Sequence, residues 1–157
     1  MKKGIFLFFL TACMLNVGAQ EKKAKGEGGK VNISAVVKDA FASKYSKATH
    51  VKWGIEKPGQ YEVEFIVNKV KMAVLFDTNG NLLETESKIN ESSLPTNIKS
   101  TLSKDFKNYK VCNIDKNIVK GSVTYELDVK KGKNELELVF DSSSKLLKRE
   151  IKEDNKD

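Results

Sequence analysis

The sequence is poor in the residues that most enzymes and metal sites use. Its 157 residues include one histidine, two cysteines and two prolines. Zinc sites draw their ligands mainly from cysteine and histidine, and His50 has no second such residue at ligand spacing. A Ser-His-Asp or Cys-His arrangement would also have to use His50. We therefore expect no metal site, no cofactor and no catalytic residue, and we place His50 on the surface.

Catalytic motifs are absent as well. The chain contains no Gly-x-Ser-x-Gly, glycine-rich phosphate loop or His-Glu-x-x-His sequence. Asp77-Thr-Asn-Gly80 is similar to the start of a calcium loop, but it lacks the glutamate at the twelfth position, and a hairpin turn accounts for it. Pairs such as Glu62/Glu64, Glu84/Glu86 and Glu135/Glu137 fall on one side of a strand, which predicts a solvated face. We predict that the chain is not an enzyme.

Long apolar runs are missing except near the beginning of the chain. Lys2 and Lys3 precede an apolar stretch at residues 4–10, and Val17-Gly-Ala19 has the small residues of a signal peptidase site. This pattern predicts a signal peptide at residues 1–19, cleaved between Ala19 and Gln20. The stretch is too short to span a bilayer.

Leu10-Thr-Ala-Cys13 offers an alternative, because it is similar to a lipoprotein box in which Cys13 carries the lipid. The residues that follow Cys13 are apolar rather than the polar tether usual after a lipidated cysteine, which favours cleavage after Ala19. The predicted location is periplasmic or secreted, with anchoring through Cys13 as the alternative.

The charge is positive but not concentrated. The formal net charge is +7, and lysines alternate with glutamates along the chain. A nucleic-acid-binding protein would gather its basic residues on one face, so we expect no nucleic-acid partner. Residues 20–30 contain three glycines and no large apolar side chain, and residues 153–157 are equally polar. We predict a disordered linker and a disordered tail.

The remainder of the chain is an internal repeat. Tyr61-Glu-Val-Glu-Phe65 returns as Tyr125-Glu-Leu-Asp-Val129, and the segment 76–83 returns as 140–147, both 64 residues later. A fixed internal period indicates that one structural unit occurs twice, here at residues 31–90 and 91–152. Each copy begins with apolar residues at a spacing of four, which predicts a helix. These residues are Ile33, Val37, Phe41 and Tyr45 in the first copy, and Leu94, Ile98, Leu102 and Phe106 in the second.

Alternating runs separated by turn residues such as Pro58-Gly59 and Asn79-Gly80 follow each helix and predict strands. We expect an α+β fold with two tandem α-β-β-β-β repeats. They would form a continuous antiparallel sheet of about eight strands with the helices packed on one face. Ser34 is the expected N-cap of the first helix, and Pro95 is expected in the first turn of the second.

One helix on four strands buries its surface poorly, so we expect the repeats to share a single core. Val51, Trp53 and Ile55 should face it together, and Cys112 should be a small buried residue. The side chains expected to line this core are Phe41, Tyr45, Trp53, Phe65, Phe76, Leu102, Phe106, Ile114, Leu127 and Phe140.

The opposite face of the sheet is the candidate binding surface. It combines a mildly apolar centre with a charged rim, which suits protein or peptide recognition. The apolar residues expected on it are Ile66, Ala73, Leu75 and Val139. Tolerated exposure of a few apolar residues is the simpler explanation.

The first copy resembles a known family in the residues Phe41-Ala-Ser-Lys-Tyr45, Ala48-Thr-His-Val-Lys-Trp53, Tyr61–Phe65, Val74–Gly80 and Leu83–Glu86. It is similar to the PepSY-like domains of exported bacterial proteins, also called β-lactamase-inhibitor-like domains. The copy from Leu94 to Glu150 is similar but more degenerate. The resemblance implies a periplasmic or secreted, non-enzymatic module of Gram-negative bacteria that presents its open sheet face to another envelope protein or a peptide.

No inhibitory loop residue can be carried over from this resemblance, so the inhibitor label is an analogy of fold. The alternative function is a structural or ligand-sequestering envelope protein, anchored through Cys13. The sequence does not indicate the partner or the oligomeric state.

Overall fold

The computed structural model describes residues 32–152. The predicted signal peptide, the cleavage site between Ala19 and Gln20, the Cys13 anchor, the linker and the tail therefore lie outside the described residues. Within them, two α-helices and eight strands follow one another in the predicted order. All eight strands form one antiparallel sheet in which the strand order equals the chain order.

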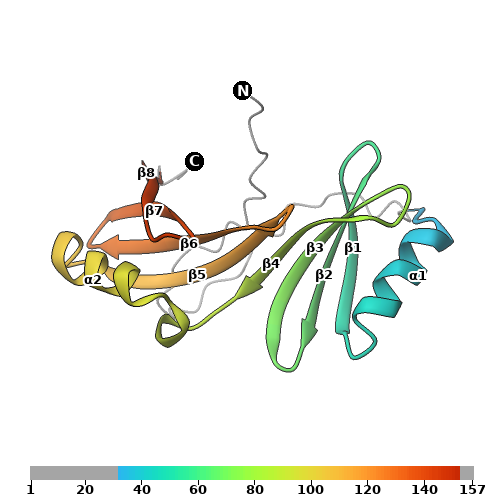
Figure 1. The fold of residues 1–157 in the computed structure, drawn as a ribbon, viewed down its shortest axis with the longest axis horizontal. Helices are drawn as coiled ribbons and strands as arrows, with labels where there is room; N and C mark the ends of the chain where they lie inside the picture. Colours follow the sequence, from blue (N-terminus) through green and yellow to red (C-terminus); the bar gives the residue numbers. More distant parts are fainter. Residues whose placement is uncertain (1–31, 153–157) are drawn as a thin grey trace.

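Each repeat contributes one α-helix and four strands. The first holds α1 (Ala35–Lys44), β1 (Thr49–Lys57), β2 (Gln60–Val67), β3 (Val70–Asp77) and β4 (Leu82–Lys88). The second holds a 3-10 helix η1 (Glu91–Ser93), α2 (Thr96–Asp105), β5 (Lys110–Val119), β6 (Ser122–Lys131), β7 (Asn134–Asp141) and β8 (Leu146–Ile151). In Figure 1 the two helices lie toward opposite ends of the molecule, with β4 and β5 between them. The α+β prediction is confirmed.

Both helices lie on the same face of this sheet. Val74 packs beneath α1 and pairs with Thr85 of β4, which pairs in turn with Ile118 of β5. Ile118 shares its side of β5 with Ile114, which packs beneath α2. Because paired residues in antiparallel strands point to the same side, the helix-facing side is continuous across the junction of the repeats.

The helix ends follow their local sequence. Ser34 caps α1 as predicted, and its Oγ accepts a hydrogen bond of 3.4 Å from the backbone N of Val37. Pro95 stands one position earlier than expected, at the N-cap of α2 rather than inside its first turn. Each helix buries two residues of its apolar stripe, Val37 and Phe41 in α1 and Ile98 and Leu102 in α2.

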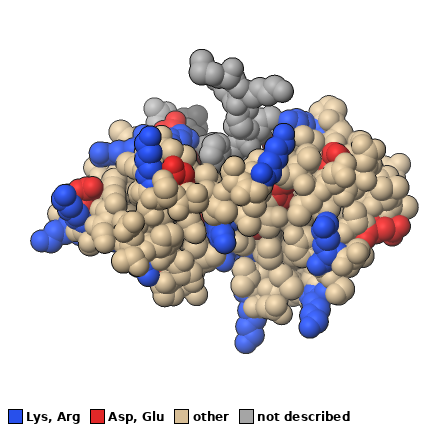
Figure 2. All heavy atoms as spheres, viewed as in Figure 1, with Lys and Arg blue, Asp and Glu red and all other residues tan. Residues whose placement is uncertain are grey.

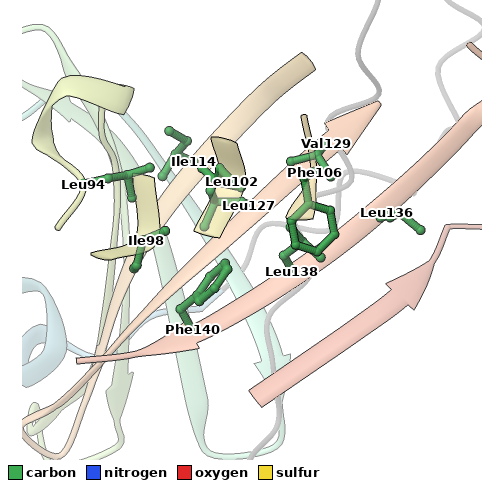
Figure 3. Packing of buried hydrophobic residues seen from close by; sticks show 10 residues of the cluster. All are labelled: Leu94, Ile98, Leu102, Phe106, Ile114, Leu127, Val129, Leu136, Leu138 and Phe140. Atoms are coloured by element: carbon green, nitrogen blue, oxygen red, sulfur yellow. The ribbon is translucent and has the colours of Figure 1, made fainter. Parts of the chain in front are cut away.

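The prediction of a single shared core is wrong, because the buried residues form two clusters. The first contains Ile33, Val37, Phe41, Val63, Phe65, Val74 and Phe76. The second contains Leu94, Ile98, Leu102, Phe106, Ile114, Leu127, Val129, Leu136, Leu138 and Phe140. Figure 3 shows the second cluster, with Ile98 and Leu102 of α2 and the C-cap residue Phe106 lying over the strands.

Polar residues at the junction explain the separation. Thr85 and Ser87 of β4 and Lys116 of β5 occupy the helix-facing side between the two helices. None of the three is fully buried, and none can extend an apolar contact from one cluster to the other. Each repeat therefore closes its own core, even though the sheet is continuous.

The edge strand β1 also differs from expectation. Trp53 is half-buried and packs edge-on against Phe41, with ring centroids 5.4 Å apart, whereas Val51 and Ile55 are 38% and 56% exposed. An edge strand has a neighbour on one side only, and irregular pairing next to Val51 and Ile55 weakens their packing further. Cys112, at the position in the second repeat that matches Val51, is half-buried rather than buried.

Candidate binding face

The open face is the side of the sheet that faces away from both helices. Strand alternation places charged residues on it in every strand. Its members include Lys52, Glu62, Glu64, Ile66, Lys71, Ala73, Leu75, Glu84, Glu86, Lys88, Asn113, Asp115, Asn117, Glu126, Asp128, Lys130, Glu135, Glu137, Val139, Lys148 and Glu150. We use the name open face for this surface throughout.

The four apolar residues predicted for binding all lie on the open face, but most are covered. Ala73, Leu75 and Val139 are 3%, 8% and 1% exposed, and Ile66 is half-buried. Long charged side chains flank them: Ala73 lies opposite Glu64 and Glu86 in the neighbouring strands. The apolar residues thus form a floor beneath charged side chains rather than an exposed patch. Their role in binding stays a prediction.

A cavity of about 310 Å³ opens on this face over β1 to β4. Ile66 and Ala73 belong to its floor, together with Glu64 and Glu86, while Leu75 and Val139 do not line it. The basic side chains that line it are those of His50, Lys52, Lys71 and Lys88. His50 is exposed as predicted, with φ at 55° and Nδ1 3.3 Å from Oγ1 of Thr49. The cavity therefore has a small apolar floor and a charged wall.

The prediction that the paired glutamates are solvated is wrong for two of them, because Glu86 is 6% exposed and Glu137 1% exposed. A buried carboxylate loses hydration, so burial raises its pKa. Burial and the charges of Glu64 and Glu56 raise the pKa of Glu62 to about 7. Burial and the charge of Glu56 also raise the pKa of Glu84.

Several charged side chains interact where the repeats meet. Asp115 of β5 accepts a hydrogen bond of 2.6 Å from Nζ of Lys88 in β4, and one of 2.8 Å from Nδ2 of Asn113. Glu86 lies near Asp115 without an ion pair of its own among residues 32–152. Burial, the charge of Asp115 and a hydrogen bond with that residue raise the pKa of Glu86 to about 8, and Lys88 only partly opposes this.

The second repeat neutralises most of its buried carboxylates. Glu137 is held by Nζ of Lys148 at 2.8 Å, and Asp128 forms an ion pair with Lys152. Burial lowers the pKa of Lys148, but its hydrogen bonds to Glu137 and Glu150 outweigh this and raise it. Glu126 forms no ion pair within the described chain. Burial together with the charge of Glu137 raises its pKa to about 7, and the charge of Lys152 only partly opposes this. A carboxyl group with such a pKa is suited to proton transfer or to binding a cation.

Other chemistry has little support among the described residues. No group of three or more His, Cys, Asp or Glu residues within positions 32–152 is arranged to hold a metal ion. The carboxylate of Asp77 accepts turn hydrogen bonds from the backbone N of Asn79 at 2.8 Å and of Asn81 at 2.9 Å. Asp141 does the same in the second repeat with Ser143 and Lys145. Side-chain hydrogen bonds from Asn81 to Asp77 and from Ser143 to Asp141, together with these backbone bonds, lower the pKa of both aspartates. They show a turn rather than a calcium loop.

Surface charge is distributed unevenly. Figure 2 shows lysine side chains projecting from the outline of both halves. On the open face, by contrast, the aspartates Asp115 and Asp128 are buried, at 5% and 3% exposed. No helix in the described part of the chain is long and apolar enough to cross a membrane.

These features agree with the comparison to protein families. The model of a PepSY-like, β-lactamase-inhibitor-like family matches residues 29–83 and 59–148, which together cover most of the chain. This chain belongs to that family and carries its unit twice. Among curated proteins, none matches.

Solved structures show the same fold. A BLIP-like protein from Bacteroides fragilis is 24% identical, with a TM-score of 0.67, covering 82% of this chain and 94% of its own. A protein from Bacteroides eggerthii that is described as periplasmic has a TM-score of 0.70 at 14% identity, covering 76% and 89%. A DUF2874 family protein from Bacteroides ovatus has a TM-score of 0.67 at 21% identity, covering 76% and 88%. At these identities the similarity concerns the fold.

Proposed function

We propose that this chain is an exported, non-enzymatic module that binds another envelope protein or a peptide through its open face. The observation that carries the proposal is a sheet of eight strands with both helices on one side. The other side is left with a cavity of about 310 Å³ and a dense array of charges. The match to a BLIP-like protein and the periplasmic description of another relative support the binding role and the location.

A surface of this kind suits specific recognition better than catalysis. Complementary charges orient a partner and exclude wrong ones, and apolar floor residues such as Ile66 supply contact area. His50 is exposed at the wall of the cavity, and its only described side-chain hydrogen bond is to Thr49. The carboxyl groups with raised pKa values fit an ion-binding network that a partner completes.

The test is capture of partners from an envelope extract by an immobilised chain comprising residues 20–157, analysed by mass spectrometry. Ile66→Lys is the informative variant, because the equivalent position of the second repeat already holds Lys130 and the backbone accepts a charge there. Val36→Lys is the matched control, since Val36 is 56% exposed on α1, on the opposite side of the molecule from the open face.

We expect partners that the parent and Val36→Lys recover and that Ile66→Lys loses. Equal recovery by all three proteins would exclude the open face as the binding surface. Circular dichroism melts of the three proteins establish that both variants are folded.

The cavity also favours a second candidate, a ligand-sequestering envelope protein anchored through Cys13. Mass spectrometry of the mature N-terminus distinguishes the two forms of processing. An acylated Cys13 supports the anchored form, whereas a chain that begins at Gln20 removes it.

A further inference from the structure

The junction of the two repeats holds a group of acceptors on the open face. Glu86 of β4 lies directly opposite Asn117 of β5, and Glu126 of β6 lies diagonal to Asn117 on the same side of the sheet. Side chains in such positions are close enough to act together on one ligand group. Glu86, Asn117 and Glu126 are called the junction site below. Glu86 is 6% exposed and Asn117 4% exposed.

The carboxylates around the junction site form ion pairs, whereas its own two do not. Lys88 lies 2.6 Å from Asp115, Lys148 lies 2.8 Å from Glu137, and Lys152 pairs with Asp128. Within residues 32–152, neither Glu86 nor Glu126 forms an ion pair. The junction site therefore holds two carboxyl groups without an ion-pair partner in the described chain, and the pKa values of both are raised.

The neutral member of the site is independent evidence for a ligand. Oδ1 of Asn117 is buried and accepts no hydrogen bond from any described residue. Folded proteins rarely leave a buried acceptor unsatisfied, and an exception calls for an explanation. A donor that arrives with a partner is such an explanation, because the Asn117 side chain lies on the same side of the sheet as the two carboxyl groups.

We propose that the junction site binds the ammonium group of a lysine side chain on the partner that docks on the open face. This inference rests on the proposed function. An ammonium group carries three donors and no acceptor, which matches one oxygen from each of the three members of the site. A guanidinium group is a planar fork with five donors, and three acceptors spread over three strands suit it less well.

The surroundings define the neighbours of that lysine. Of the three members of the site, Glu86 lines the cavity of about 310 Å³, which opens on the open face. Lys52, Lys71 and Lys88 line the same cavity and repel a strongly basic segment. The partner segment is therefore expected to present one lysine with neutral or acidic neighbours.

Proton binding is linked to occupation of the site. Burial and the charge of Asp115 raise the pKa of Glu86, and a bound ammonium group favours the ionised carboxylate and lowers that pKa. Ammonium binding therefore releases protons and strengthens as the pH rises toward about 8. The other charged groups that face the site are Glu64 on β2, Lys71 on β3, Glu84 and Lys88 on β4, Asp115 on β5, Asp128 on β6, Glu137 on β7, Lys148 on β8 and Lys152.

The experiment uses n-butylammonium, which reproduces the charged end and the four-carbon stem of lysine. The chain comprising residues 20–157 is titrated at pH 8 and followed by NMR, through the side-chain amide of Asn117 and the carboxyl carbons of Glu86 and Glu126. We expect saturable shifts at all three groups, weaker binding at pH 6, and no response to the uncharged analogue butanol.

Glu86→Gln with Glu126→Gln removes the charges with little change of shape. We expect at least about a tenfold loss of affinity, because hydrogen bonds to charged acceptors are the stronger ones. The double variant should melt no lower than the parent, since it removes buried carboxylates that have no ion pair. Glu135→Gln, a glutamate on the same face next to Lys130, is the matched control and should bind like the parent.

Three results would overturn the proposal. The first is the absence of a saturable shift throughout the millimolar range, and the second is equal binding by the double variant. The third is a shift of the Asn117 amide signal when Lys22, Lys23, Lys25 and Lys30 are changed to glutamine. Such a shift would mean that lysines of the chain itself occupy the junction site. Failure here leaves the capture test with Ile66→Lys unaffected, because that variant does not alter the junction site.

Discussion

The two repeats share one backbone plan and differ most on the open face. Positions 64 residues apart are equivalent, so Ala73 of β3 corresponds to the buried Glu137 of β7. Likewise Glu84 of β4 corresponds to Lys148 of β8, the residue that neutralises Glu137. Among the described residues, no ion pair lies wholly within the first repeat, whereas the second holds four.

The helix-facing sides of the two repeats have the same arrangement of elements but differ in the kinds of side chain that pack there. Phe41, Tyr45 and Phe65 pack as a group of aromatic rings in the first repeat, with centroids 4.7–5.5 Å apart. The second cluster is built mainly of leucine, isoleucine and valine around Phe106 and Phe140. The core and turns thus preserve the unit while the open face varies. Differences between the open faces are therefore where partner specificity should be sought.

Loss of a central phenylalanine should have the largest effect and tests whether the two cores are separate. Phe76 and Phe140 are equivalent and 0% exposed, so Phe76→Ala and Phe140→Ala should each lower the free energy of unfolding by about 3–5 kcal/mol. Trp53→Ala should cost less than either, because Trp53 is only half-buried. Urea denaturation measures all three.

The milder pair Phe76→Leu and Phe140→Leu extends this test to a double-mutant cycle. Each change should cost about 1 kcal/mol, and the two costs should add to within about 0.5 kcal/mol, because the clusters share no buried residue. A coupling energy clearly above that value would mean that the cores act as one.

A change of pH should have the next largest effect on the free energy of unfolding. It allows Glu62 of the first repeat to be compared with Glu86 at the junction. Glu62 and Glu86 have pKa values of about 7 and about 8 in the folded state, above the ordinary value of 4.5. Between about pH 4.5 and about pH 8 the folded state therefore binds more protons than the unfolded state does. Raising the pH through this range lowers the free energy of unfolding. We expect a loss of about 2–3 kcal/mol between about pH 5 and about pH 9, mostly from the more deeply buried Glu86.

Glu86→Gln should flatten this dependence more than Glu62→Gln does. Urea denaturation across the pH range measures the slope for each protein. A profile of Glu86→Gln that is as steep as that of the parent would contradict the raised pKa. The lowered pKa values of Asp77 and Asp141 act only in acid, where protonation removes the stability that their turn bonds contribute.

The last comparison concerns one turn position that the repeats fill differently, and it includes the smallest predicted effect. Gly80 has φ at 78°, and a Cβ there would lie 3.0 Å from Cβ of Ala40 and 3.2 Å from the carbonyl oxygen of Val36. Its equivalent, Ser144, has φ at 69° and therefore bears the strain of a left-handed non-glycine residue.

Exchange of these residues should have opposite effects in the two repeats. Gly80→Ser should destabilise by about 1–3 kcal/mol, through strain and the clash with α1. Ser144→Gly should stabilise by about 0.5–1 kcal/mol, because it removes the strain. Thermal melts of the two variants provide the measurement, and changes of the same sign would show that the turns are not equivalent.

Several features were predictable because their cause is local. The apolar spacing of four placed both helices, and strand alternation with turn residues placed the eight strands in their order. Ser34 was recognised as a cap for the same reason, since a side-chain oxygen at that position satisfies a backbone N–H a few residues away. The open face followed from the same alternation, and Ile66, Ala73, Leu75 and Val139 were placed on it correctly.

Burial was harder to predict because it depends on cross-strand neighbours. Val139 is covered in part because Glu126 and Lys148 lie on either side of it, 13 and 9 residues away in the sequence. The low exposure of Glu86 and Glu137 has the same kind of origin, and a local pattern of alternating charge does not reveal it. Thr85 and Ser87 did carry a signal for two cores, since both are polar on the helix-facing side.

The order of residues alone was thus sufficient for the duplicated unit, its helices and strands, and the side of the sheet to which each residue points, because periodicity acts over short distances along the chain. Only the tertiary structure determined that there are two cores. It also determined which carboxylates are buried and which of them form an ion pair with a lysine. Those outcomes depend on side chains from different strands that meet in space, and on the exclusion of water that their packing causes around Glu86, Asn117 and Glu126.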